Sequence, residues 1–86
     1  MGFLIIRMNN IEKVLITINH CIEHSYGVRS DDLAKILDCS QRTAVRVINT
    51  IQDNWHIMQY LDIRVDHVDS RYGGNPYMVL YVRVKK

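Results

Sequence analysis

The spacing of the apolar residues changes once along this 86-residue chain. In residues 11–51 apolar side chains recur three or four positions apart, which is typical of amphipathic helices. After Trp55 they alternate with charged residues, as in LDIRVD at 61–66, and a period of two predicts a half-buried strand. The sequence therefore predicts one α+β domain, mainly α, over residues 1–86, with its helices first and its strands last.

The first predicted helix follows Asn9 and Asn10, which are suitable N-caps. It spans about 14 residues and carries one apolar stripe. Gly27 is expected to stop the helix, because glycine is the commonest residue at a helix C-terminus. The residues of the stripe, all expected to face the core, are Ile11, Val14, Leu15, Ile18 and Ile22.

The second predicted helix has Ser30 as its N-cap. Asp31 and Asp32 lie in its first turn, where the helix dipole favours negative charge. Its predicted buried side consists of Leu33, Ala34, Ile36 and Leu37. The helix is expected to end at the polar break in residues 38–40.

The third predicted helix begins after Ser40 as N-cap and continues to about Asp53. It has two different faces. The apolar face is expected to include Ala44, Val47, Ile48, Ile51 and then Trp55. The other face is polar or cationic and consists of Gln41, Arg42, Arg46 and Asn49, with Val45 among them. A helix that packs with one face and offers amide and guanidinium groups on the other suits the DNA major groove.

Two strands joined by a tight turn are expected over residues 60–85. In the second strand, Met78, Leu80, Val82 and Val84 share one side, and Tyr81, Arg83 and Lys85 the other. Gly73-Gly74 between two alternating segments is a strong hairpin signal. Residues 28–29 are expected to form only a short extended link. Residues 1–8, with the apolar run Phe3 to Ile6, extend the domain at its N-terminus.

Charge and composition limit the classes of partner. The net charge of +2 comes from residues 55–86, where the hairpin could contact a polyanion. The chain has no apolar run near the roughly 20 residues of a membrane span, and residues 3–6 are too short for a secretory signal. We therefore expect a cytoplasmic protein without membrane contact.

The two cysteines, Cys21 and Cys39, are expected to be reduced and largely buried.

The segment at 30–54 and the hairpin that follows it resemble the winged helix-turn-helix domains of bacterial, archaeal and phage transcription regulators. The DeoR-like and biotin-repressor-like versions carry the approximate motif LA..L.VS.RTV.R.I..L. Its counterparts here are Leu33-Ala34, Leu37, Cys39-Ser40, Arg42-Thr43-Ala44, Arg46, Ile48 and Ile51. Asp38 replaces a frequent glycine, and Val45 stands at a frequently basic position. No effector domain follows the hairpin, so no small-molecule effector is implied.

The resemblance implies a winged helix-turn-helix fold, with three helices followed by a two-stranded wing. The third helix would lie in the major groove. Its candidate DNA-binding residues are Ser40, Gln41, Arg42, Thr43, Arg46 and Asn49. Gln41 could pair with adenine and Arg42 or Arg46 with guanine, while the others suit phosphate contacts. The wing candidates, for the minor groove or the backbone, are Arg71, Tyr72 and Asn75.

Two functions stay open from the sequence. The first is a sequence-specific regulator of double-stranded DNA, a repressor of phage, viral or plasmid origin that binds as a homodimer supported by residues 1–8. The second is a winged-helix module for protein–protein interaction. An enzyme is not expected, because no nucleophile–base pair or phosphate-binding loop occurs. No cofactor is expected. His20 and His24 share a helix face, but two ligands are too few for a metal site.

Overall fold

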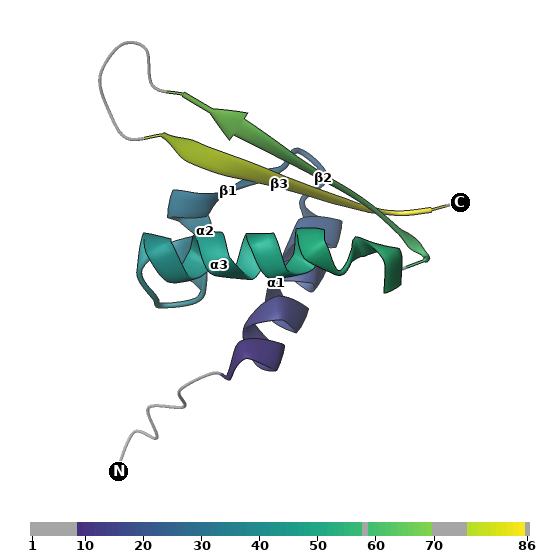
Figure 1. The fold of residues 1–86 in the computed structure, drawn as a ribbon, viewed down its shortest axis with the longest axis horizontal. Coiled ribbons are helices and arrows are strands. Elements are labelled where there is room, and N and C mark those ends of the chain that lie inside the picture. Colours follow the sequence, from purple (N-terminus) through teal and green to yellow (C-terminus); the bar gives the residue numbers. More distant parts are fainter. Residues whose placement is uncertain (1–8, 58, 70–75, 86) are drawn as a thin grey trace.

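The structure is a computed structural model that describes residues 9–57, 59–69 and 76–85. It contains three α-helices and a sheet of three strands (Figure 1). The predicted α+β class, with helices before the hairpin, is confirmed. In chain order the elements are α1 (Asn10–Glu23), β1 (Val28–Arg29), α2 (Ser30–Ile36), α3 (Gln41–Asp53), the 3-10 helix η1 (Trp55–Ile57), β2 (Leu61–Val68) and β3 (Tyr77–Val84).

The sheet has one strand more than the sequence predicted. Its order is β1-β3-β2, and both pairings are antiparallel. Residues 28–29 are not a mere link, because Val28 pairs with Leu80 and Arg29 with Val79 on the edge of β3 that β2 leaves open. A strand of two residues is too short to show alternation, so the sequence pattern could not reveal it. The hairpin pair itself, β2 with β3, is confirmed.

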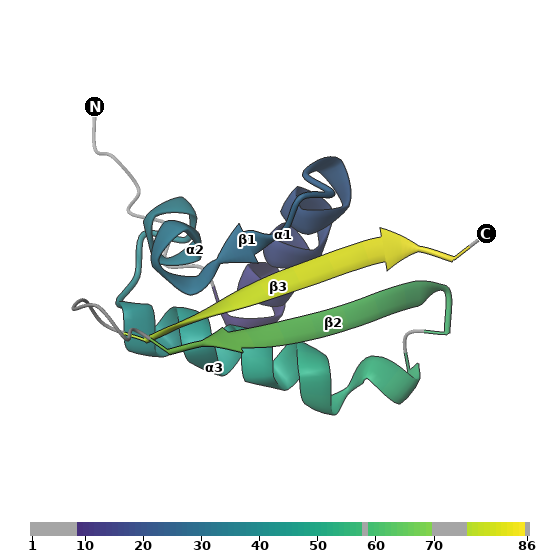
Figure 2. The same cartoon turned by 90° about the horizontal axis from the view of Figure 1, so that it is seen from above.

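All three α-helices lie on one face of the sheet (Figures 1 and 2). The hydrophobic core lies between the helices and the sheet. The half-buried Leu61, Ile63 and Val65 of β2 pack against it. The largest fully buried apolar side chains come from α2 and its C-cap residue, from α3 and from β3, and they are Leu33, Leu37, Ile48, Ile51, Leu80 and Val82. The core-facing sides that periodicity predicted for α3 and β3 are therefore largely confirmed.

α1 is turned away from the orientation that its apolar stripe predicted. Its fully buried residues are Thr17 and Cys21, while Ile11, Leu15 and Ile22 are exposed. Thr17 can be buried because its hydroxyl donates to the carbonyl oxygen of Lys13 at 2.7 Å, so no polar atom is left unpaired. The small side chains let α1 approach β3 closely, and three of the five residues of the predicted stripe face outward as a result.

Three further residues predicted to be buried are exposed: Ile36, Trp55 and Val84. Each stands at or just beyond the end of an element, where the periodic pattern no longer applies. α3 ends at Asp53, so its period does not carry the indole to the core. The opposite error concerns Val45, which was predicted on the polar face but is half-buried and packs against the core.

The helix starts agree only partly with the predicted caps. Asn9 caps α1 in a capping box with Glu12, and its Oδ1 accepts the Glu12 N–H at 2.8 Å. Ser30 is not a cap, because it is the first residue of α2 and its buried Oγ accepts the N–H of Met78 at 3.1 Å. This bond ties α2 to β3. Gly27 does not end α1, which stops at Glu23.

Gly27 instead lies where the chain turns into β1, with a φ of 92°. A Cβ at this position would lie 2.5 Å from the ring of Tyr81. Positive φ and the close approach of the ring both require glycine here.

Among the helices that the structure describes, none is long and apolar enough to cross a membrane.

The two cysteines differ in burial, since Cys21 is inaccessible to solvent and Cys39 is only partly buried. Burial raises the pKa of the Cys21 thiol from 9.0 to about 11, because the thiolate is poorly solvated in the core. The prediction that both are free thiols is consistent with this arrangement. The prediction that both are largely buried is correct for Cys21 alone.

A stability prediction follows for alkaline pH. Between pH 9 and pH 11 the unfolded thiol ionises while the buried one stays protonated. The free energy of unfolding should therefore fall by about 1.4 kcal/mol per pH unit in this window, with no such slope below it. Urea unfolding of the wild type and of Cys21→Ala between pH 8 and pH 11 checks this, since tyrosine and lysine titrate in both proteins. Parallel pH profiles for the two proteins would contradict it.

Candidate nucleic-acid interface

The outward face of α3 carries Arg42, Arg46 and Asn49, all exposed. They are four and three positions apart, so they lie in one row along the helix. The opposite face of α3 holds its four buried residues, Ala44, Val47, Ile48 and Ile51. Because the core holds that side of the helix firmly, the outward row has a fixed direction. The sequence predicted these three residues on the exposed face, and the structure places them together there.

The two arginines of this row have free hydrogen-bonding capacity. Within the described ranges, neither Arg42 nor Arg46 forms an ion pair. Each guanidinium offers five N–H donors in a planar fork. Asp53 ends the same row with a negative charge, so the cationic part of the face lies in the N-terminal half of α3.

The remaining candidates on α3 lie at the flanks of this row or at its start. The Ser40 Oγ accepts the N–H of Thr43 at 3.2 Å, and the two hydroxyls are 3.1 Å apart. Ser40 thus caps α3, as predicted, and its hydroxyl already has partners within the protein. Gln41 and Thr43 are half-buried. Ser40 and Thr43 thus hold the start of the helix, and the half-buried Gln41 is less accessible than the arginines.

A hollow of about 590 Å³ runs between the outward face of α3 and the N-terminal part of α1. Lys13 of α1 lines it together with Arg46 and Asn49. The full lining comprises Asn10, Lys13, Val14, Thr43, Arg46, Val47, Asn49, Thr50 and Asp53. The sequence analysis did not include Lys13 or Thr50, because only the packing of α1 against α3 brings them beside the arginine row.

The predicted wing residues Arg71, Tyr72 and Asn75 lie outside the described residues. The strands that lead to them are described. The end of β2 and the start of β3 lie at the same end of the molecule as the start of α3 (Figures 1 and 2).

Two arginines of the sheet, Arg29 and Arg64, are held by contacts with neighbouring side chains. The guanidinium of Arg29 lies 3.9 Å from the ring centre of Tyr77 and pairs with Asp31 at 3.0 Å. Arg64 is stacked on Tyr81 at 4.3 Å, and it pairs with Asp66 at 3.3 Å. Stacked and paired guanidiniums of this kind stabilise the sheet surface locally. They contrast with the two arginines of α3.

The two histidines at the C-terminal end of α1 contact each other through their rings. The rings of His20 and His24 are 4.2 Å apart between centres and meet edge to face. In the described ranges no group of three or more His, Cys, Asp or Glu side chains could hold a metal ion. Nothing in this part of the molecule adds a third ligand to the pair.

Comparisons of the chain with protein-family models, with curated proteins and with solved structures found no match. The central feature of the surface formed by α3 and α1 is a row of two arginines and an asparagine on a firmly packed helix, and both arginines are unpaired among the described residues.

Proposed function

We propose that this protein is a sequence-specific regulator of double-stranded DNA of the winged helix-turn-helix type. The observation that carries the proposal is the outward row of α3, where Arg42, Arg46 and Asn49 are exposed and both guanidiniums are unpaired among the described residues. An α-helix with its side chains is about 10–12 Å wide, and the major groove is about 12 Å wide. α3 can therefore enter the groove with this row facing the bases.

The arrangement of elements is compatible with the resemblance stated above. Three helices precede an antiparallel hairpin, and the polar break before α3 positions its N-terminal half at one end of the molecule. In a winged helix-turn-helix this half would read the bases while the hairpin tip contacts the minor groove or the backbone. The tip residues proposed for that contact are Arg71, Tyr72 and Asn75.

The contacts divide into two kinds with different consequences. Arg42 and Arg46 would pair bidentately with guanine, and each good pair contributes about 1–3 kcal/mol of discrimination. Lys13, Asn49 and the hydroxyls of Ser40 and Thr43 would contact phosphate, which sets affinity and register but not sequence. Gln41, half-buried at the flank of the row, would reach an adenine only at the edge of the site.

The regulator would act as a repressor by occupying its operator. A homodimer would contact two half-sites related by a two-fold axis, with the α3 helices roughly 34 Å apart, one turn of DNA. Two copies also double the number of base and phosphate contacts. A single recognition row with two cations would bind DNA weakly.

Selection from random duplex DNA with the wild type, Arg46→Ala and Lys13→Ala tests the proposal. The wild type should enrich a motif. Arg46→Ala should lose the preference at one base position of each half-site. Lys13→Ala should enrich the same motif with lower affinity, and the slope of log affinity against log salt should shrink by about one. Failure of the wild type to enrich any motif at low salt would contradict the proposal.

A second function has a specific observation in its favour. Several large apolar side chains are exposed, among them Ile11 and Ile57, and such surfaces bind other proteins. A winged-helix module for protein–protein interaction would use them without reading DNA sequence. Salt separates the two functions, because phosphate contacts weaken steeply between low and moderate salt while an apolar interface does not.

A further inference from the structure

The outward side of α1 carries an apolar stripe of which only Ile18 packs against the core. Ile11, Leu15 and Ile22 are 71%, 55% and 36% exposed, and the half-buried Ile18 lies between them in sequence. The steps along this stripe are four, three and four residues. This is the spacing of the seam in a pair of packed helices, where apolar residues repeat every 3.5 residues on average. α1 thus has one face in the core and a second apolar face in solvent.

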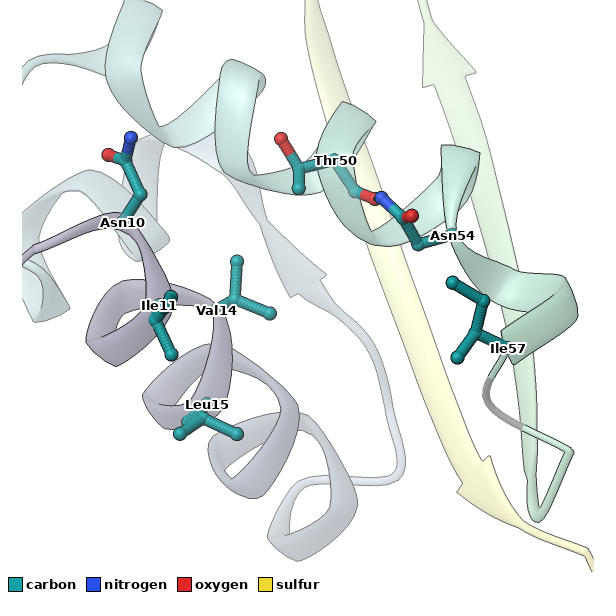
Figure 3. A pocket seen from close by; sticks show the side chains of 7 residues that line it. All are labelled: Asn10, Ile11, Val14, Leu15, Thr50, Asn54 and Ile57. Atoms are coloured by element: carbon teal, nitrogen blue, oxygen red, sulfur yellow. The ribbon is translucent and has the colours of Figure 1, made fainter.

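A groove widens this apolar surface toward the end of α3. It has a volume of about 310 Å³ and separates α1 from η1. Ile11 and Leu15 line it on one side, and Ile57, which is 68% exposed, stands on the other (Figure 3). Polar side chains border it, namely Asn10, Thr50 and Asn54. An apolar centre with a polar border is the usual composition of a protein–protein interface.

The stripe is complementary to itself when its direction is reversed. The steps read four, three, four from either end, so an antiparallel copy of α1 places Ile11 against Ile22 of the second copy and Leu15 against Ile18. We propose that this face is the interface between two copies of the chain, whose α1 helices pack antiparallel about a two-fold axis. Such an isologous contact uses the same patch on both copies and closes after two.

The area of this apolar surface is compatible with the binding of a second copy of the chain. A stable, specific interface buries about 800 Å² on each partner. A helix of this length extends about 21 Å, so the stripe alone supplies only the apolar centre of such an area. The groove with Ile57 enlarges it on one side, and the exposed Glu12 and Asn19 border it on the other.

The role of this interface on DNA rests on the proposed function, because two copies would contact two half-sites. The existence of the dimer does not depend on DNA binding. Leu15 lies on the stripe, whereas Arg42 lies on the outward row of α3. Loss of the dimer and loss of base contacts can therefore be measured separately.

Sedimentation equilibrium of the full chain between 1 and 50 µM tests the interface. The wild type should be a dimer, and Leu15→Glu should raise the dimer dissociation constant on the order of 100-fold. Ile16→Glu is the matched control, because Ile16 is 39% exposed on the same helix but outside the stripe. It should leave the dimer unchanged. A monomeric wild type at 50 µM, or equal effects of the two substitutions, would overturn the proposal.

A charge pair tests the antiparallel arrangement. Ile11→Glu and Ile22→Lys should each be monomeric alone, and their mixture should form a heterodimer, because one Glu then faces one Lys across the axis. In a parallel pair these two positions do not meet. Absence of a heterodimer in the mixture would therefore overturn the antiparallel packing. DNA binding is measured independently on a single half-site, where Leu15→Glu should match the wild-type monomer and Arg46→Ala should not.

Discussion

The double substitution Arg42→Glu and Arg46→Glu is expected to abolish specific duplex binding, with a loss of at least about 1,000-fold in affinity. Each guanidinium would lose a base contact of about 1–3 kcal/mol, and each new carboxylate would repel the phosphates. The fold should persist, because both side chains are exposed and form no ion pair in the described part of the chain. Fluorescence anisotropy with the selected duplex measures the affinity, and circular dichroism measures the thermal midpoint.

The control for this pair changes the net charge by the same amount elsewhere. Lys35 on α2 and Arg83 on β3 are both exposed and belong to other elements than α3. Lys35→Glu with Arg83→Glu should weaken binding only through the general charge, and raised salt should reduce the difference from the wild type. Equal losses for the two double variants would contradict a role for α3 in reading DNA.

The substitution Leu80→Ala is expected to cost about 2–5 kcal/mol in the free energy of unfolding. Leu80 is fully buried in the central strand, pairs with Val28 on one side and Val65 on the other, and its carbonyl oxygen lies 4.0 Å from the Cys21 sulfur. Helices and sheet therefore meet at this side chain, so the cavity cannot close easily. Domains have a total stability of roughly 5–15 kcal/mol, and the loss is a large part of it.

Urea unfolding and thermal unfolding at one fixed protein concentration measure this loss. The thermal midpoint should fall by more than about 10 °C. Val84→Ala is the matched control, since Val84 lies on the same strand and is exposed at its end. It should cost less than about 1 kcal/mol. If Leu80→Ala lowered the free energy of unfolding by less than about 1 kcal/mol, the central packing role given to Leu80 would be wrong.

Most of the local structure could be predicted from the sequence. The helices follow from apolar spacing, and the caps Asn9 and Ser40 follow from side chains that accept backbone N–H bonds. The outward row of α3 could also be predicted, because a helix of this length with one strongly apolar face leaves only one face for solvent. These features depend on residues that are near one another in the chain.

The two largest errors concern contacts between distant segments. The third strand depends on pairing of Val28 and Arg29 with β3, some 50 residues later. The orientation of α1 depends on how closely Thr17 and Cys21 let it approach that strand. The apolar arc of α1 is wide enough for either of its halves to face the core. Its pattern alone could not choose between them.

The sequence by itself determined the helices, the hairpin strands and the cationic face of α3, because each depends on a local period or on a neighbouring cap. Only the tertiary structure decided that Lys13 joins Arg46 along one hollow and that Ile11 and Leu15 face solvent. The physical reason is that the core has room for only one side of α1. Packing against β3 selects the side with small residues and leaves the larger apolar side chains outside.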